Sequence, residues 1–307
     1  FIFCFLPVFM LIYYLVPGKL RNLLLFLGSL IFYAWGEPVY VILMLFSSIF
    51  NYYMGTELER LYYDDRKQKI NLIFSIIINL AVLVFFKYYG FLLNTIGGII
   101  GIHIPHPELS LPIGLSFYTF RNLSYLFDIY LSKVSAQRNF LTFSVYSTMF
   151  PYTSAGPIVR YTDIETQLKQ RTINISKFGI GAELFVKGLA KKVLLVDNLS
   201  VLYSSICGHP QMSVFTSWLG ILAYTMQLYF DFSGYSDMAI GLGKMLGFDF
   251  NKNFDYPYIS TSVSEFWRRW HISLGSWFRD YIYIPLGGNR VSTLKHIRNI
   301  LVVWALT

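Results

Sequence analysis

Apolar and polar positions alternate in long blocks along the chain, which indicates helices joined by short polar turns. The apolar blocks cover residues 1–16, 23–35, 39–54, 72–102, 111–131, 140–151, 178–206, 214–248 and 299–307. A helix needs about 20 apolar residues to cross a hydrocarbon core, so several blocks are too short to span it alone. The pattern predicts an all-α fold, a polytopic membrane bundle with broken or re-entrant helices around a central cavity.

Glycine and proline mark the predicted breaks. Gly36 and Pro38 divide one long run, which predicts an outer turn or a kinked pair of helices. The segment FPYTSAGPIVR, residues 150–160, contains two prolines and a glycine and cannot be a regular helix throughout. Irregular backbone at membrane depth needs protein or a water-filled cavity around it. This segment is therefore either re-entrant and cavity-lining or a loop at the membrane interface.

Composition and charge agree with a membrane protein. Apolar residues make up 55% of the chain and charged residues 14%, whereas soluble domains carry about 25% charged residues. Residues 1–307 are therefore predicted to form a single integral membrane domain. The net charge of +8 does not indicate nucleic-acid binding, because the basic residues stand between apolar runs, as in cytoplasmic loops.

The distribution of lysine and arginine predicts an orientation. Residues 60–69 and 252–298 are rich in them, whereas residues 36–38, 103–110 and 208–213 contain none. By the positive-inside rule, the first group is cytoplasmic and the second group faces outward.

No metal site is expected. Cys4 and Cys207 lie in or beside apolar runs and are predicted to be small buried hydrophobic residues. His103 and His106 stand three apart, but Pro105 lies between them and a metal site needs further ligands.

The candidate chemistry is concentrated in EFWRRWHISLGSWFRDYIYIPLGGNR, residues 265–290. Ser262 and Glu265 form a capping box, which predicts an amphipathic helix from residue 262 to Pro285, followed by the PLGGNR turn that ends at residue 290. At helical spacing His271 lies on an apolar stripe. The other members of that stripe are Trp267, Trp270, Leu274, Trp277 and Tyr281. The helix is either a place for chemistry or an interfacial helix anchored by its aromatic residues.

This segment resembles the signature region of the membrane-bound O-acyltransferase superfamily, in the branch that contains bacterial alginate O-acetyltransferase. Three more motifs agree in order: LPIGLSFYTF at 111–120, FPYTSAGPIVR at 150–160 and YFDFSGYSDMAIGLGKMLGF at 229–248. The run NFDYPYISTSVSEFWRRWHISL then follows. The ending YIPLGGNR favours polysaccharide acetylation over transfer of D-alanine to teichoic acids.

The resemblance implies a multi-pass O-acyltransferase of the bacterial plasma membrane, with a tunnel through the bundle. It implies transfer of an acyl group, taken as acetyl, from cytoplasmic acetyl-coenzyme A or another acyl thioester to hydroxyls of an exported polysaccharide. No bound cofactor is implied. Members of the branch work with a separate extracytoplasmic acyltransferase or polysaccharide-assembly partner.

The resemblance also aligns His271 with the first of the family's two histidines. A neutral imidazole can accept the proton of a hydroxyl that attacks a thioester, and an apolar wall keeps it neutral. The alternative is a core histidine bonded to a backbone carbonyl. The family's second histidine, in a Trp-His-Gly motif, is expected beyond Thr307. The chain is therefore expected to be a fragment cut at both ends and inactive alone.

Other polar residues are candidates for binding the donor or the acceptor. Arg268 and Arg269 suit the phosphates of a coenzyme A-type donor, or they pair with Glu265 and lipid headgroups. Asn289 and Arg290 follow a glycine pair whose N–H groups could cradle an anion.

Asp231 and Asp237 interrupt an apolar run, and an intramembrane carboxylate suggests a functional site. The alternative is that hydroxyls or backbone groups satisfy both at a helix break. Lys191 and Lys192 are expected to snorkel to the interface. Small residues near the two aspartates predict close helix packing: Gly234, Ser236, Ala239, Gly241, Gly243 and Gly247.

A transporter or channel for a polar or anionic substrate, without covalent chemistry, is the rival interpretation. Intramembrane carboxylates, broken helices and a cavity suit it equally. The histidine-bearing signature helix distinguishes the two, since a transporter has no need of it.

Overall fold

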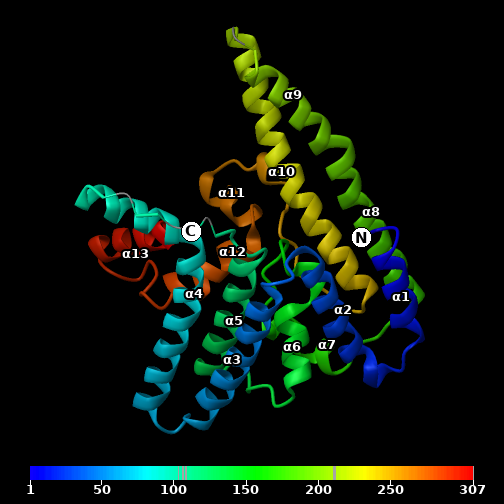
Figure 1. The fold of residues 1–307 in the computed structure, drawn as a ribbon, viewed down its shortest axis with the longest axis vertical. Helices are drawn as coiled ribbons and strands as arrows, with labels where there is room; N and C mark the ends of the chain where they lie inside the picture. The colour runs from blue at the N-terminus through cyan, green and yellow to red at the C-terminus, as the bar shows by residue number, and fades with distance from the viewer. Residues whose placement is uncertain (103, 106, 108, 210–211, 307) are drawn as a thin grey trace. The chain divides into compact units, whose positions relative to one another are not determined.

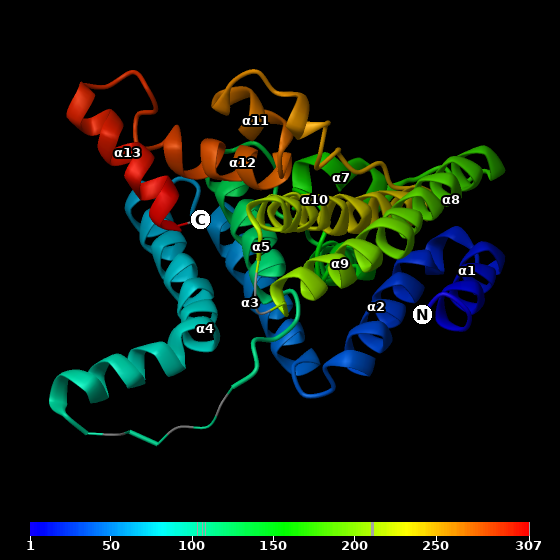
Figure 2. The ribbon, with the colours of Figure 1, turned by 90° about the horizontal axis from the view of Figure 1, so that it is seen from above.

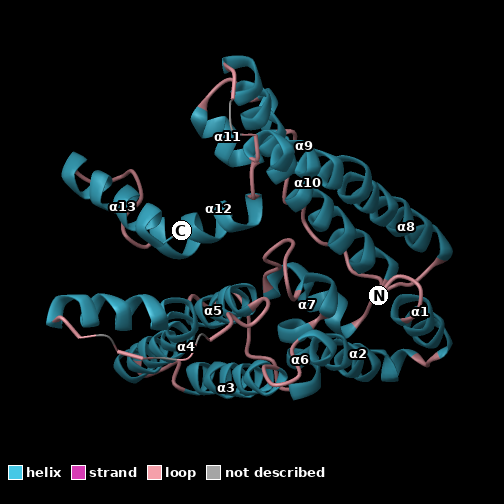
Figure 3. Ribbon diagram, turned by 45° about the horizontal axis from the view of Figure 1, so that its top comes forward, coloured by secondary structure: helices cyan, strands magenta, loops and turns pink. Residues whose placement is uncertain are grey.

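The structure, a computed structural model, describes residues 1–102, 104–105, 107, 109–209 and 212–306. Within these residues every regular element is helical, which confirms the all-α prediction (Figure 3). His103 and His106 lie outside the described residues, as do parts of two of the three segments that were predicted to face outward. The chain forms two compact units, unit 1 (Phe1–Ser154 and Arg160–Lys169) and unit 2 (Ala155–Val159 and Gln170–Thr307). The single membrane domain stays a prediction.

Unit 1 contains the helices from the N-terminus to α7 (Figure 1). They are α1 (Phe5–Leu15), η1 (Gly18–Leu20), α2 (Arg21–Gly36), α3 (Val41–Arg60), α4 (Asp65–Ile100), α5 (Leu115–Tyr130), α6 (Phe140–Thr148), η2 (Phe150–Tyr152) and α7 (Tyr161–Lys169). The predicted break at Gly36 and Pro38 is confirmed, because α2 ends there and α3 begins after it. Helix α3 packs against α4 and α5, and α2 packs against α6.

Two helices of the described residues are long and apolar enough to cross a membrane, α3 and α4. Several other apolar runs form shorter helices: α2, α5 and α8 have 16 residues each, below the length of about 20 that a span needs. The structure therefore supports an all-helical chain with some membrane-compatible helices.

A buried polar network holds α5 and α6 together in unit 1. The side chain of Arg121 has no exposed surface. Its terminal nitrogens donate hydrogen bonds to the carbonyl oxygens of Ser147, at 2.9 Å, and Tyr152, at 2.7 Å. Asn122 extends the network by accepting a bond from the Ser147 hydroxyl at 3.1 Å and donating one to Ser47 on α3 at 3.0 Å. Each of these bonds joins two different segments of the unit.

Unit 2 is built on two long helical rods followed by short helices (Figure 2). Its elements are α8 (Ile175–Ala190), η3 (Lys191–Val196), α9 (Asp197–Cys207), α10 (Val214–Met245), η4 (Pro257–Ile259), α11 (Val263–Arg269), α12 (Ile272–Phe278), η5 (Arg279–Tyr283) and α13 (Thr293–Leu306). Helix α8 continues through the π-helix η3 into α9, and this rod lies beside α10.

Glycines bring α8 and α10 into backbone contact. A Cβ on Gly188 would lie 2.4 Å from the carbonyl oxygen of Gly234, and one on Gly241 would lie 2.6 Å from that of Gly181. Real Cβ atoms do not approach so closely, so only glycine fits both positions. The predicted close packing of small residues is confirmed at Gly234 and Gly241.

The same packing pairs the acidic residues of α10 with lysines of η3. Asp237 accepts a hydrogen bond from Lys191 at 2.6 Å, and Asp231 accepts one from Lys192 at 2.7 Å. Helix α10 is unbroken across both aspartates, so the interpretation as a helix break satisfied by hydroxyl or backbone groups is wrong. The snorkelling prediction for the lysines missed these pairs, because the partners lie on a different helix. A functional role for either aspartate stays a prediction.

Candidate active site

The signature segment is two short helices rather than one. Helix α11 ends at Arg269 and α12 begins at Ile272, and His271 between them has a left-handed backbone with φ of 43°. The predicted start is confirmed, since the Ser262 hydroxyl accepts a hydrogen bond from the N–H of Glu265 at 3.2 Å. The prediction of a continuous helix to Pro285 is wrong.

Hydrogen bonds to the preceding loop explain the break. The N–H of Ile272 donates to the main-chain oxygen of Asn253 at 2.9 Å, and that of Asp255 donates to the main-chain oxygen of Arg269 at 2.9 Å. A continuous helix would need these same groups of Arg269 and Ile272 for its own ladder. The loop therefore replaces helical bonds on both sides of His271.

Two phenylalanines that contact each other lie against one side of the imidazole of His271. The ring of Phe232, from α10, meets it edge-on with centroids 4.7 Å apart, and the ring of Phe254 lies nearly parallel at 6.4 Å. Nε2 of His271 is buried and has no hydrogen-bond partner within the described part of the chain. Burial lowers the pKa of His271 to about 4, so the imidazole is neutral at ordinary pH and can accept a proton.

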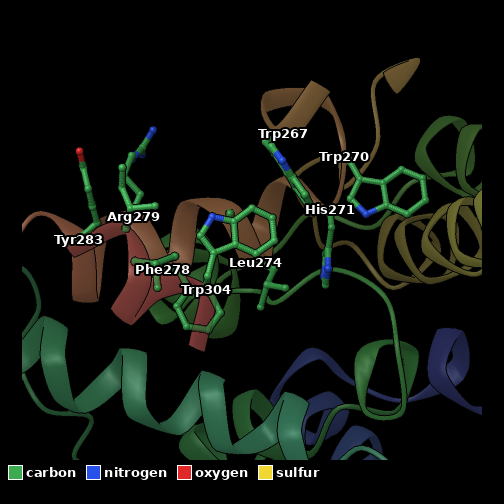
Figure 4. Close-up of a pocket in the computed structure, with 11 residues that line it drawn as sticks. Trp267, Trp270, His271, Leu274, Phe278, Arg279, Tyr283 and Trp304 are labelled. Carbon is green, nitrogen blue, oxygen red and sulfur yellow. The ribbon is translucent and has the colours of Figure 1, made fainter. Parts of the chain in front are cut away.

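His271 lies at one end of an apolar pocket of about 450 Å³ (Figure 4). Arg279 and Tyr283 line the opposite end. The complete lining is Trp267, Trp270, His271, Leu274, Gly275, Phe278, Arg279, Tyr283, Ile300, Val303 and Trp304. The predicted stripe divides, because its first three members line this pocket while Trp277 and Tyr281 are buried outside it. The π-helix η5, which begins at Arg279, follows α12 directly.

The two arginines predicted to bind the donor lie elsewhere. Arg269 bonds to Glu265 through Nε at 3.0 Å and to the main-chain oxygen of Asp255 at 3.0 Å, as the helical-pair alternative expected. Arg268 is exposed and does not line the pocket. The arginine at the pocket is instead Arg279, whose guanidinium also bonds to Asp280 at 2.7 Å.

The glycine turn before Asn289 and Arg290 does not offer the expected anion cradle. The N–H of Gly287 donates to Ile284 at 2.9 Å, and that of Gly288 donates to Tyr283 at 2.8 Å. Asn289 and Arg290 are exposed and do not line the pocket. The prediction of unused N–H groups at this turn is wrong, because both glycine N–H groups bond back to the end of η5 and the residue after it.

The predicted carboxylates also lie away from the pocket lining. Asp231 and Asp237 hold lysines of η3, while Phe232 beside Asp231 contacts the imidazole. Sequence reasoning missed Phe232, Asn253 and Phe254, although all three fall in motifs that carried the family resemblance. Only the fold shows that these positions converge on His271.

No group of His, Cys, Asp or Glu suited to a metal occurs among the described residues. Cys4 and Cys207 are exposed, so the prediction that they are buried is wrong. Each stands at a helix end, Cys4 before α1 and Cys207 as the last residue of α9.

The site thus combines a buried histidine with an apolar pocket on a scaffold whose described elements are all helical. The chain matches MBOAT, the membrane-bound O-acyltransferase family, over residues 35–306 and belongs to it. The resemblance noted from the sequence is thereby confirmed.

Individual relatives are similar over the whole chain. A protein described as probable alginate O-acetylase AlgI, from Pseudomonas aeruginosa, is 44% identical over 310 residues, which cover 100% of this chain and 60% of the relative. Its counterpart from Azotobacter vinelandii is 43% identical, with 100% and 62% covered. The peptidoglycan O-acetyltransferase of Helicobacter pylori is 34% identical over 341 residues, with 100% and 64% covered. The chain thus spans about 60% of the length of the curated relatives it matches.

Proposed function

We propose that the protein is a membrane O-acetyltransferase that moves an acetyl group to hydroxyls of a cell-surface polysaccharide. The observation that carries this proposal is the buried, unpartnered Nε2 of His271 at the end of an apolar pocket. A buried polar atom without a partner lowers stability, so its retention at a pocket favours a role in chemistry over a role in packing.

The names of the relatives support the class of acceptor. Those relatives are described as acting on alginate and peptidoglycan, which are both glycan polymers outside the cytoplasm. For this protein we propose an exported polysaccharide as acceptor and acetyl-coenzyme A or another acyl thioester as donor. A multi-pass bundle around a tunnel in the bacterial plasma membrane, with an extracytoplasmic partner, would let the two substrates meet from opposite sides.

The pocket suggests how the donor lies. An acyl thioester would place its carbonyl beside His271 and its uncharged arm along Leu274 and Phe278, with its anionic part near Arg279. Guanidinium groups suit phosphate. The apolar walls would exclude water and so suppress hydrolysis of the thioester.

The proposed reaction needs one proton acceptor. The acceptor hydroxyl loses its proton to Nε2 of His271, or to a group that His271 orients, as its oxygen attacks the thioester carbonyl. The carbon–sulfur bond then breaks, and the proton passes to the leaving thiolate. The products are an O-acetyl ester and a free thiol.

A labelling experiment tests the proposal. Membranes containing the full-length protein and its polysaccharide substrate would be incubated with acetyl-coenzyme A labelled in the acetyl group. We expect ester-linked label on the polysaccharide, lost in His271→Ala and retained in His209→Ala, a histidine outside the pocket lining. Polysaccharide that stays unlabelled while the substrate crosses the membrane would contradict the proposal and favour the transporter.

A further inference from the structure

Asn253 is a buried amide whose polar atoms are all used. The residue is 1% exposed and lies in the loop between α10 and η4. Its Nδ2 donates to the Ser236 hydroxyl of α10 at 3.1 Å and to the carbonyl oxygen of Gly156 at 3.4 Å. Its Oδ1 accepts from both the N–H of Ser273, at 3.2 Å, and the Ser273 hydroxyl, at 2.8 Å. One side chain therefore joins three segments of unit 2.

Asn253 also takes over the bonds that would continue the signature helix through His271. In a continuous helix, the N–H groups of Ile272 and Ser273 would donate to carbonyl groups four residues earlier. Both donate to Asn253 instead, the first to its main-chain oxygen and the second to its Oδ1. The left-handed backbone of His271 costs about 1–2 kcal/mol in a residue other than glycine. These bonds offset that cost.

A second contact fixes the same turn from the other side. The Ser273 hydroxyl accepts a hydrogen bond from the N–H of Ile158 at 2.9 Å. Ile158 and Gly156 belong to the non-helical residues 155–159, so this segment bonds to both members of the Asn253–Ser273 pair. The proline- and glycine-containing motif thus has a structural use: it supports the first turn of α12.

The loop that fixes the backbone of His271 also forms a wall against its ring. Phe254 follows Asn253 directly and lies nearly parallel to the imidazole, with 13° between the ring planes. Phe232 covers the ring from α10. A shift of Asn253 would therefore move the backbone of His271 and one of its aromatic neighbours together.

We propose that Asn253 is a positioning residue, which holds His271 in its left-handed conformation and keeps the imidazole against Phe232 and Phe254 at the end of the pocket. The role of Asn253 in turnover rests on the proposed function, but its role in fixing the position of the His271 imidazole does not. Ser273 is the partner through which Asn253 acts.

The test compares four versions of the full-length protein: wild type, Asn253→Ala, Ser273→Ala and Asn51→Ala. Asn51 is a matched control, because it is also a buried asparagine with side-chain hydrogen bonds but belongs to unit 1. Modification of each histidine by diethylpyrocarbonate would be followed by mass spectrometry. We expect His271 to react several-fold faster in Asn253→Ala and Ser273→Ala than in wild type, with the other histidines unchanged. Asn51→Ala should react as wild type does.

The pH profile of acetyl transfer shows whether a variant displaces His271 or only lowers the amount of folded protein. Release of the ring into water should move the acid limb of kcat/KM toward the ordinary histidine value of about 6.5, and kcat should fall about tenfold or more. A smaller folded fraction would lower the amplitude of kcat/KM without moving the acid limb, and Asn51→Ala should keep the acid limb of wild type. Arg279 is the charged residue of the pocket lining and is unaltered in all versions.

Unchanged reactivity of His271 in both variants would overturn the proposal. If Asn253→Ala does not accumulate in membranes, Ser273→Ala decides by the same criteria, since it removes only a hydroxyl. If wild type transfers no acetyl group, the proposed function fails, and the modification rate of His271 still decides whether Asn253 positions it.

Discussion

Unit 1 and unit 2 each bury a basic side chain among apolar helices, but the two side chains are bonded differently. Arg121 donates to two carbonyl oxygens and lies over the Tyr152 ring, with its guanidinium carbon 4.4 Å from the centroid. His271 lies against two aromatic rings, and its Nε2 has no hydrogen-bond partner among the described residues. Within the described part of the chain, Nε of Arg121 also lacks a hydrogen-bond partner, yet its two terminal nitrogens hold α6 and η2 in place.

The hydrogen bonds of Arg121 stabilise the fold of unit 1, whereas the free Nε2 of His271 leaves the imidazole able to react. Ser147 lies in the last turn of α6, where carbonyl groups have no helical partner and carry partial negative charge. A permanently charged guanidinium suits them. A neutral imidazole in an apolar wall contributes little to cohesion, but it remains available to accept a proton. Substitutions of Arg121 and of His271 alter one side of this contrast at a time.

The largest effect is expected from Arg121→Met, on stability. Two hydrogen bonds from a charged donor are each worth about 1.5–3 kcal/mol, so the free energy of unfolding should fall by about 3 kcal/mol or more. The measurement is the temperature at which the purified full-length protein loses its monodisperse chromatographic peak. Arg60→Met, which removes the ion pair of an exposed arginine with Glu57, is the control and should leave that temperature nearly unchanged. Equal transitions in both variants would show that Arg121 does not hold α6.

His271→Ala should have the opposite profile. Acetyl transfer should fall by about 10² or more, because a proton acceptor or its orienting group is removed, whereas the unfolding temperature should change little. Transfer rates and the chromatographic transition would be measured on the same preparations. Full activity would make His271 a core histidine, and a transition lowered as far as in Arg121→Met would remove the contrast.

Arg279→Ala should act on binding of the donor. If its guanidinium faces the anionic part of a coenzyme A thioester, KM for that donor should rise about tenfold with kcat changed less, as expected when ground-state and transition-state binding are lost together. Acetyl-pantetheine, which has no phosphate, should be used equally well by wild type and variant. Arg268→Ala is the comparison, and a larger increase of KM in that variant would assign donor binding to Arg268.

The smallest effect concerns pH. Because burial lowers the pKa of His271 to about 4, the imidazole stays neutral as pH falls, and kcat/KM should be flat from about pH 8 to pH 5 before it declines. An acid limb near the ordinary histidine value would contradict the buried, neutral imidazole.

The lowered pKa of His271 also makes the free energy of unfolding decrease as the pH falls. Below about pH 6.5 the unfolded chain binds a proton at His271 that the folded chain does not. The free energy of unfolding of wild type should therefore fall relative to His271→Ala as pH decreases from about 6.5 to 4, and the two should run parallel above that window. Parallel curves throughout would show that His271 is not shifted.

Local sequence signals predicted where the signature helix begins, but they did not predict its interruption at His271. The capping box at Ser262 depends on residues three apart, and it was found correctly. The left-handed turn at His271 depends on bonds to Asn253 in a preceding loop. Helical periodicity cannot detect such bonds, so the sequence predicted one helix where the structure has two.

The charged residues of unit 2 show the same limit. Small residues on α10 predicted close packing, and the contact between Gly188 and Gly234 confirms it. The sequence could not predict which charged residues this contact brings together, because Lys191 lies on η3 and Asp237 lies on α10. The burial of Arg121 was not predicted either, since its partners are carbonyl groups that only the fold supplies.

The left-handed backbone at position 271 also limits how this position can change during evolution. Asparagine, aspartate and histidine are several-fold enriched in that conformation, whereas β-branched residues are outliers there. Asparagine is therefore the replacement that keeps the backbone and a polar side chain while it removes the proton acceptor. Lineages that lose or alter the chemistry should pass through asparagine or glycine at this position. For the same reason, His271→Asn separates catalysis from folding more cleanly than a valine would.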